Sequence, residues 1–464
     1  MSDTATSAAE STTDVVVVGM GPAGESVAGQ LAEAGLDVVG IDRELVGGEC
    51  PYWGCVPSKM MIRAAHLLEE ARRIPGMAGK ADVTPDWAPV AERIRAEATD
   101  NWDDTVAVER FEGKGGRFIR GHGRLVGPDT VQVGELRIRA TTGIVLATGT
   151  SPAVPPIDGL ADTPFWTNHE AIEAVDLPGS LIVLGGGAIG IELAQVFSRF
   201  GVDVTVVEAE DRLLPVEEPE VSEIVAEVFG AEGIDVRVGV RADSVGYERQ
   251  RFTVRLSDGG VLEADRLLVA TGRRLNVGDL GLEHVGLAGD VRAIPVDEHL
   301  RVASAERVWA VGDVTGEGAF THVGMYQAAI ATADVLGREH EPADYAALPR
   351  VTFADPEVGV VGLTEQDARD SELDVRTATQ RVPHTARGWI HKAGNEGVIK
   401  LVADRSTGTL VGATVVGPNG GEVLGLLALA VHARVPVDRL RTMIYAYPTF
   451  HRGIEDAVNQ LDMS

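Results

Sequence analysis

The chain has 464 residues, of which 44% are hydrophobic, and its 70 acidic and 41 basic side chains give a formal charge of -29 at pH 7. This length is typical of about three domains, and the hydrophobic fraction is ample for packed cores. The acidic excess argues against binding to nucleic acid or to an anionic membrane surface. We interpret it as a solvated acidic surface that keeps the protein soluble.

Residues 1–13 are polar and lack the basic and apolar regions of a secretory signal, so we expect a disordered tail. No run in the sequence approaches the roughly 18 apolar residues that a membrane span requires. We therefore expect a cytoplasmic protein that makes no membrane contact. In that reducing compartment, two cysteines close together in sequence are more typical of catalysis than of a structural disulfide.

A glycine-rich turn follows the first apolar run, at residues 14–18. The turn contains Gly19, Gly21 and Gly24, and a helical pattern then leads to a second strand that ends at Asp42. Glycines let the backbone approach a pyrophosphate at a helix N-terminus, and an acid that closes the second strand can bind a ribose hydroxyl. The stretch predicts a dinucleotide-binding βαβ unit.

The same unit recurs in the middle of the chain. An apolar strand runs into a turn with Gly185, Gly187 and Gly190, and the next strand ends at Glu208. The acid follows the first glycine at the same separation along the chain in both copies. Such a repeat predicts two dinucleotide sites.

Three later apolar strands, at 144–149, 267–272 and 308–313, each run into a glycine turn. The first two end in the same tripeptide, Ala-Thr-Gly, which supports a duplication of the unit. The third delivers a carboxylate at its turn. The residues at these turns are Gly149, Gly272, Gly312 and Asp313.

The pattern changes in the C-terminal part of the chain. Between the two units a single helix is expected, from about Trp87 to Val108. From residue 345 onward, short strands alternate with turns and are followed by two helices. It contains no glycine fingerprint. We therefore expect an α+β domain that binds no nucleotide and is a candidate for subunit contact.

Both cysteines of the chain, Cys50 and Cys55, lie five positions apart. Five positions along a regular helix separate two Cα atoms by roughly 8 Å, beyond the roughly 7 Å limit for a disulfide. A bridge therefore requires the backbone to leave the helix, which Pro51 and Gly54 permit, while Pro57 suits the start of the following helix. A zinc site would need further ligands, so we favour a redox-active dithiol and expect no metal site.

Two dinucleotide sites and a dithiol form a path for an electron pair from nicotinamide to a flavin and on to a disulfide. At this point the chain resembles the pyridine nucleotide-disulfide oxidoreductases, over about residues 14–464. The block Gly-Gly-x-Cys-x4-Cys-Val-Pro-Ser-Lys that ends at Lys59 is highly specific for that family.

The resemblance implies FAD at the first fingerprint, with Asp42 on its ribose and Asp313 on its ribityl chain. It implies a nicotinamide dinucleotide at the second fingerprint. Glu208 repels a 2′-phosphate and accepts a hydrogen bond from a 2′-hydroxyl, so NADH is favoured over NADPH. Arg212, the only nearby cation, weakens this preference slightly.

The resemblance also assigns the catalytic side chains. Cys55 would lie against the flavin as the charge-transfer thiolate, and Cys50 would exchange with substrate. Lys59 and Glu192 match the ion pair that the family places beside flavin N5.

The implied fold is α/β, with two doubly wound, Rossmann-like dinucleotide-binding domains and a C-terminal α+β dimerisation domain of a homodimer. After the tail at 1–13, the expected segments are 14–150 for the first part of the FAD domain, 151–275 for the NAD(P) domain, 276–344 for the completion of the FAD domain and 345–464 for the dimerisation domain.

The chain departs from the family near its C-terminus. The usual His-x-His-Pro-x-x-x-Glu, which serves the partner subunit's dithiol, is replaced so that Tyr447 stands at the second His and Arg452 at the Glu. Tyrosine has an ordinary pKa of about 10 against about 6.5 for histidine, so it is a poor general base at neutral pH but can donate a hydrogen bond. His451 and Glu455, one helical turn apart, are a candidate displaced dyad; the alternative is a surface or subunit-contact histidine.

We therefore expect a homodimeric FAD-dependent NAD(P)H oxidoreductase that reduces a small-molecule acceptor through the Cys50–Cys55 disulfide. The acceptor classes are a disulfide, a quinone-like molecule or a metal ion. Mercury is not expected as the natural substrate, because the C-terminal cysteine pair of mercuric reductase is missing here. Two alternatives are a diaphorase or transhydrogenase with idle thiols, and a non-catalytic electron-carrying flavoprotein component.

Overall fold

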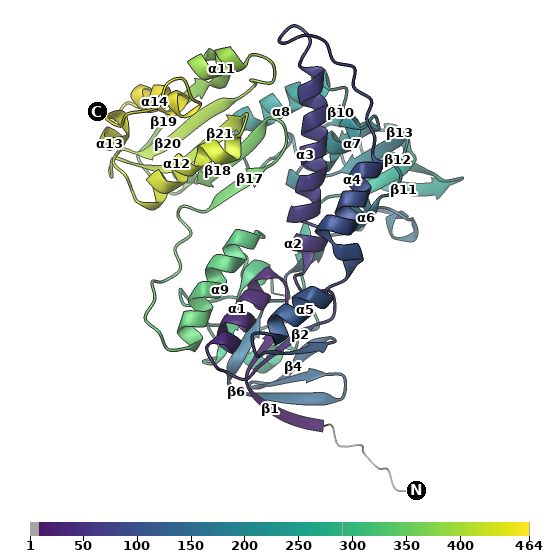
Figure 1. The fold of residues 1–464 in the computed structure, drawn as a ribbon, viewed down its shortest axis with the longest axis vertical. Helices are drawn as coiled ribbons and strands as arrows, with labels where there is room; N and C mark the ends of the chain where they lie inside the picture. Colours follow the sequence, from purple (N-terminus) through teal and green to yellow (C-terminus); the bar gives the residue numbers. More distant parts are fainter. Residues whose placement is uncertain (1–8, 290, 464) are drawn as a thin grey trace. The chain divides into compact units, whose positions relative to one another are not determined.

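The computed structural model describes residues 9–289 and 291–463 (Figure 1), which fall into two compact units. One of the points where the chain passes from the first unit to the second falls within helix α3 (Cys55–Arg72). The first unit comprises the described parts of Met1–Pro57, Arg95–Pro152 and Arg273–Asp344, and the second comprises Ser58–Ile94, Ala153–Gly272 and Tyr345–Ser464.

The first unit is built on a seven-stranded sheet with the order β3-β2-β1-β6-β5-β4, in which β16 also pairs with β6. Strands β3, β2, β1, β6 and β16 are parallel, and valines such as those of the run Val15–Val18 are buried, as expected of a parallel sheet covered on both faces. Helices α1 and α9 lie side by side (Figure 1). The main elements are β1 (Ala9–Val18), α1 (Pro22–Glu33), β2 (Val38–Asp42), α2 (Glu49–Tyr52), α5 (Thr105–Glu112), β3 (Arg117–Arg120), β4 (Gly123–Gly127), β5 (Thr130–Val133), β6 (Leu136–Leu146), β7 (Thr150–Pro152), β15 (Arg273–Leu275), β16 (Val308–Ala310) and α9 (Thr321–Val335).

The N-terminal part of the second unit repeats this design on a smaller scale. A parallel sheet with the order β10-β9-β8-β14 is accompanied by an antiparallel sheet, β11-β12-β13. The elements are α4 (Ala88–Arg93), α6 (Asn168–Glu173), β8 (Ser180–Leu184), α7 (Ala188–Arg199), β9 (Asp203–Val207), α8 (Pro219–Ala231), β10 (Asp235–Arg237), β11 (Ala242–Glu248), β12 (Arg251–Leu256), β13 (Val261–Ala264) and β14 (Arg266–Val269).

The C-terminal part of the second unit is an antiparallel sheet with the order β17-β18-β21-β20-β19. Helix α12 packs on β18 and β21, and α14 packs on β19 and β20, around one apolar core (Figure 1). The elements are β17 (Pro349–Thr352), β18 (Glu357–Gly362), α10 (Glu365–Asp370), β19 (Val375–Arg381), α11 (Ala386–His391), β20 (Val398–Asp404), β21 (Thr409–Gly417), α12 (Gly420–His432), α13 (Val437–Arg441) and α14 (His451–Gln460).

Two sequence-based expectations are wrong in detail. The tail expected at residues 1–13 is wrong for residues 9–13, because β1 begins at Ala9 and pairs in register with β6 from Leu136; residues 1–8 lie outside the described part. The single helix expected from about Trp87 to Val108 is broken at Asp100–Trp102, three consecutive residues with φ between 47° and 57°. Left-handed backbone cannot continue a right-handed helix. Among the described residues, no helix combines the length and apolar character needed to cross a membrane.

A buried charge network lies between α3 and α7 within the second unit. Arg199 of α7 is 2% exposed, and its guanidinium is 2.6 Å from Glu232 and 2.8 Å from Asp355. Arg73, directly after α3, contributes a further ion pair to Asp355 at 2.8 Å. Burial beside this network lowers the pKa of His66, on α3, to about 4.

This lowered pKa predicts a specific pH dependence of stability. The folded chain keeps His66 neutral down to about pH 4, whereas a histidine in the unfolded chain binds its proton near pH 6.5, at about its ordinary pKa. Between these values the unfolded state binds more protons, so the free energy of unfolding falls as the pH is lowered, by about 3 kcal/mol at most for this group.

We therefore expect a His66→Gln variant to lose less stability between pH 6.5 and pH 4 than the parent, as measured by urea unfolding at several pH values. The control is His432→Gln, at an exposed histidine, which should follow the parent curve. Identical pH dependence in the parent and in both variants would show that His66 makes no contribution.

Candidate active site

The first glycine turn combines close packing with an open backbone. Gly19 has φ of 96°, and a Cβ there would overlap the carbonyl oxygen of Ala147. A Cβ on Gly24 would overlap the carbonyl oxygen of Gly19, whereas a Cβ on Gly21 would meet no atom within 4 Å. The outer glycines therefore pack the turn onto its sheet and helix, and the middle one leaves its backbone accessible to a pyrophosphate.

The second glycine turn has the same geometry. Gly185 has φ of 112° and lies against the carbonyl of Ala270, and Gly190 lies against the carbonyl of Gly185. A Cβ on Gly187 would again meet no atom within 4 Å. The predicted duplication therefore extends to how the backbone packs.

The two predicted ribose-binding acids reach back to their own glycine turns. Asp42 accepts a hydrogen bond from the amide of Met20 at 2.6 Å, and burial raises the pKa of Asp42 above its ordinary value. Glu208 is buried and accepts hydrogen bonds from the amides of Gly186 at 2.5 Å and Glu210 at 2.8 Å. Each carboxylate is thus fixed at the end of a β-strand beside the open glycine.

The turns after the later strands are also ordered. The amide of Gly312 donates to Gln327 at 2.6 Å, and Asp313 accepts from the hydroxyl of Thr150 at 2.5 Å. Arg273 donates to the same hydroxyl at 2.7 Å, so Asp313 belongs to a short polar chain within the first unit.

Gly149 and Gly272 occupy equivalent places in the two units. Both have left-handed φ, of 63° and 117°, and a Cβ on either would meet no atom within 4 Å. The first unit therefore has open backbone at Gly21 and Gly149, and the second has it at Gly187 and Gly272. The residues of the first unit fit FAD, and those of the second fit a nicotinamide dinucleotide.

The backbone between the two cysteines departs from the helix, as predicted. Cys50 lies in α2, which ends at Tyr52, and Cys55 is the first residue of α3. No disulfide joins the two cysteines in the structure; Cys50 is partly buried and Cys55 is exposed. The Sγ of Cys55 is 3.4 Å from the hydroxyl of Thr321, at the start of α9, a contact that could not be predicted because the two residues lie far apart in the sequence.

The two thiols are not equivalent. The Cys50 thiol forms a hydrogen bond with Cys55 and is partly buried, and both effects raise the pKa of Cys50 above that of an ordinary thiol. The two thiols of the pair therefore do not lose their protons at the same pH.

Two glycines bring the segment that carries Cys50 close to the first glycine turn. The amide of Gly47 donates to the carbonyl of Met20 at 2.8 Å. Gly48 has φ of 63°, and a Cβ there would lie 2.9 Å from the Cα of Gly21. The first unit thus brings together the open glycine and the segment that carries Cys50.

The predicted ion pair between Lys59 and Glu192 is present in the second unit, with 2.7 Å between Nζ and the carboxylate. The other oxygen of Glu192 accepts from the amide of Phe353 at 2.8 Å. The ammonium group of Lys59 also lies 4.7 Å from the centre of the Phe353 ring. Phe353 was not among the predicted site residues, because it is far from both partners in sequence.

The altered C-terminal segment does not form the displaced dyad. Tyr447 is 72% exposed, and His451 is the first residue of α14. Glu455 pairs instead with Arg452 at 2.7 Å, and Arg452 also contacts Asp456 at 3.0 Å. Within the described residues, no ion pair joins His451 to Glu455.

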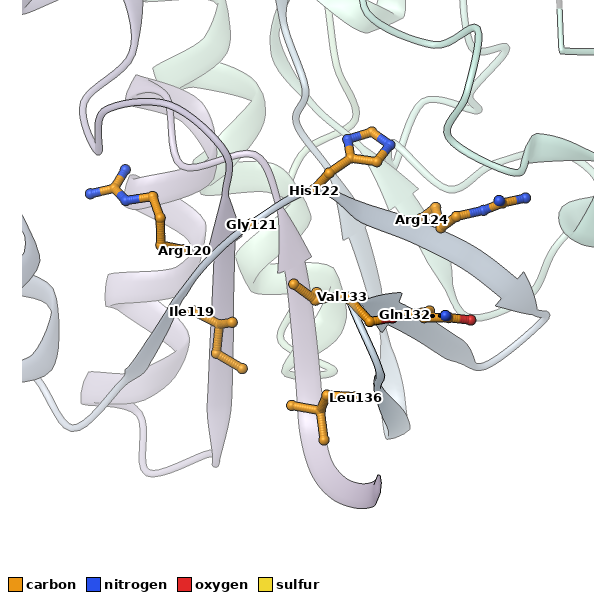
Figure 2. A pocket seen from close by; sticks show the side chains of 9 residues that line it. Ile119, Arg120, Gly121, His122, Arg124, Gln132, Val133 and Leu136 are labelled. Carbon is orange, nitrogen blue, oxygen red and sulfur yellow. Dashed lines mark hydrogen bonds between the residues drawn. The ribbon is translucent and has the colours of Figure 1, made fainter. Parts of the chain in front are cut away.

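An open cavity of about 580 Å³ lies beside β3 and the β4–β5 hairpin in the first unit (Figure 2). None of the predicted site residues lines it. Its lining consists of Ile119, Arg120, Gly121, His122, Arg124, Gln132, Val133, Gly134 and Leu136.

Comparison with known proteins places this geometry in a family. Residues 13–333 match the family model described as pyridine nucleotide-disulphide oxidoreductase, and residues 348–458 match the dimerisation domain of that family. A mercuric reductase from Acidithiobacillus ferrooxidans is 36% identical over 454 residues, which cover 95% of this chain and 81% of the relative. A dihydrolipoyl dehydrogenase from Halobacterium salinarum is 33% identical over 464 residues, which cover 96% of this chain and 95% of the relative.

Solved structures give the same result. A mutant of the HOCl-induced flavoprotein disulfide reductase RclA from Escherichia coli, as a Cu(II) complex, has a TM-score of 0.85 and 27% identity, covering 97% of this chain and 99% of that chain. LpdA from Mycobacterium tuberculosis has a TM-score of 0.84 and 28% identity, with the same coverage.

These matches confirm the predicted fold class, the homodimer-forming C-terminal domain, and the use of FAD and NAD(P)H. They also confirm that the protein is an enzyme. The chain belongs to the pyridine nucleotide-disulphide oxidoreductases, the FAD- and NAD(P)H-dependent flavoenzymes.

Proposed function

We propose that this enzyme transfers electrons from NADH through FAD to the Cys50–Cys55 pair and from there to a thiophilic metal ion, with Cu(II) as the representative acceptor. The observation that carries the proposal is a cysteine pair held near the first glycine turn by Gly47 and Gly48, in a chain that lacks the family's acid/base pair: Tyr447 stands where the family's histidine is expected, and Arg452 pairs with Glu455 and Asp456. Bound FAD supplies the group that takes a hydride from nicotinamide and passes an electron pair to a disulfide.

The nature of the acceptor follows from the proton requirement. Reduction of a disulfide substrate releases a thiolate, and a general acid assists that step by protonating it. Tyr447 is a weak substitute for histidine in this role, because the ordinary pKa of tyrosine is higher than that of histidine by about 3.5. A metal ion bound by thiolates needs no such acid.

The electrons balance for copper. Two Cu(II) ions displace the thiol protons, each takes one electron, and the products are two Cu(I) ions and the Cys50–Cys55 disulfide. The relatives support this chemistry, since several are mercuric reductases and RclA was solved as a Cu(II) complex.

We assign the roles of the side chains accordingly. Cys55 is the thiolate next to the flavin, which is supported by the raised pKa of Cys50 and by the hydroxyl of Thr321 at 3.4 Å from Cys55. Cys50 meets the acceptor. Lys59 and Glu192 take the role of the ion pair beside flavin N5. Cys55 is the more exposed of the two thiols, and variants of the two cysteines distinguish their roles.

The test is anaerobic reduction with NADH. The parent should develop a long-wavelength charge-transfer band after two-electron reduction; Cys55→Ser should lose the band, and Cys50→Ser should keep it. With Cu(II) and a chromogenic Cu(I) chelator, turnover should fall at least about 100-fold in Cys50→Ser, which is equivalent to about 2.7 kcal/mol of transition-state stabilisation. Turnover of a quinone by the same variant serves as the control for intact flavin reduction.

Each alternative gives a different result. Absence of the band in the parent would remove the dithiol from the mechanism. Undiminished Cu(II) turnover in Cys50→Ser would favour a diaphorase with idle thiols. A flavoprotein that reduces no small acceptor but co-purifies with a stoichiometric partner would be an electron-carrying component.

The preference for NADH is tested at Glu208. We expect Glu208→Gln to lower the ratio of kcat/KM for NADH to that for NADPH by at least about tenfold, or about 1.4 kcal/mol, because the substitution removes the charge that repels a 2′-phosphate. Glu210→Gln is the matched control, since it removes an exposed acid two residues away. An equal change in both variants would show that the effect is general electrostatics and not recognition by Glu208.

A further inference from the structure

Three side chains that the proposed function does not use meet in the first unit, near the C-terminal end of α9. His299, Asp334 and His340 each offer a ligand atom, and these atoms lie within 4.8 Å of one another. The two imidazole rings are nearly perpendicular, with centroids 5.0 Å apart.

The orientation of His340 points to a cation. Its Nδ1 lies 2.9 Å from the carbonyl oxygen of Glu341, and since a carbonyl only accepts, Nδ1 carries the hydrogen. Its Nε2 is then directed at the carboxylate of Asp334, 3.5 Å away. In a neutral ring this places two lone pairs opposite each other, an arrangement that requires a proton or a metal ion between them. A backbone carbonyl that orients the second ring nitrogen is typical of metal-binding histidines.

His299 supplies a second observation. Its Nδ1 is buried and has no hydrogen-bond partner within the described part of the chain. An unsatisfied buried polar atom costs roughly 1–3 kcal/mol, which a bound cation would remove. The turn that carries it is well ordered, because the amides of His299 and Arg301 both donate to Asp297 at 2.9 Å. Leu300, between them, has φ of 66°, an uncommon value for a residue other than glycine.

Asp334 is held by its own partners. The indole of Trp309 donates to one carboxylate oxygen at 2.7 Å, and Arg301 donates to both oxygens at 2.7 Å. Arg301 opposes a cation here, but a carboxylate has about four lone-pair sites, so its oxygens can still accept another partner. The carboxylate of Glu298, 3.7 Å from Nε2 of His299, adds negative charge at the exposed side.

We propose that His299, Asp334 and His340 bind a borderline divalent transition-metal ion, of the class of Zn²⁺, with water completing the coordination. Two imidazoles and one carboxylate are a donor set that suits such ions. Metal–donor bonds of about 2.0–2.2 Å mean that the three side chains close on the ion. The ion would link the turn before β16, the end of α9 and the segment after it, which the hydrogen bond from Ala343 to Glu298 at 2.8 Å already connects.

The proposed metal site uses none of the residues assigned to the redox chemistry, so metal binding is tested in protein that lacks both cysteines. Zn²⁺ is titrated into FAD-loaded, chelator-treated Cys50→Ser/Cys55→Ser protein, so that no thiolate competes, with a chromogenic zinc indicator as the competitor. We expect one equivalent to bind per chain and to raise the melting temperature, because the ion binds only the folded state. Substitution of both histidines, His299→Gln and His340→Gln, should weaken binding by more than the roughly 10–100-fold typical of losing an outer-shell partner.

The controls address general histidine and charge effects. His284→Gln removes an exposed histidine of the same unit that also lies beside a glutamate, Glu283, and should leave zinc affinity unchanged. Arg301→Gln removes the opposing charge and should tighten binding. The proposal is overturned if the parent binds no more tightly than the double histidine variant, if His284→Gln weakens binding equally, or if Arg301→Gln does not tighten it. In the first case, His340 pairs with Asp334 as an imidazolium.

Discussion

The approach of the Gly47–Gly48 backbone to the first glycine turn is the constraint on which the redox centre depends. At Gly48 a Cβ would come within 2.9 Å of the Cα of Gly21, and the Gly47 amide bonds to Met20 at 2.8 Å. A side chain at Gly48 would push the loop away from the turn and would need a left-handed backbone. Cys50 follows two residues later, so this approach fixes how near the thiols lie to the nucleotide-binding turn.

The same physical solution appears at both nucleotide turns, and it was predictable because it is local in sequence. The first and third glycines pack against each other, at Gly19 with Gly24 and at Gly185 with Gly190. The acid that ends the second strand then accepts a hydrogen bond from an amide inside the turn. Each part of this arrangement lies within one βαβ unit, so strand pattern, glycine spacing and acid identity suffice to predict it.

Other features were missed because their partners are distant or compete. Residues 9–13 look like a tail by their polarity, yet β6 supplies backbone partners for them far along the chain. The helix break at Asp100–Trp102 contains no glycine or proline from which it could be predicted. The spacing makes Glu455 a candidate partner of His451, but Arg452, one turn away on the same helix, provides a full positive charge and forms the ion pair instead.

The position of the Glu192 carboxylate depends on more than its ion pair with Lys59. The side chain of Lys59 is 34% exposed, and a partly solvated ion pair contributes little by itself. Glu192 is instead held by the Phe353 amide, and Gln195, on the same face of α7, exchanges two hydrogen bonds with the backbone of Asp355. Through Glu192 and Gln195, one face of α7 thus forms hydrogen bonds with the segment before β18 at two successive turns of the helix. The Phe353 amide therefore helps to position the carboxylate independently of the lysine, and the ion pair adds to an arrangement that the backbone already supports.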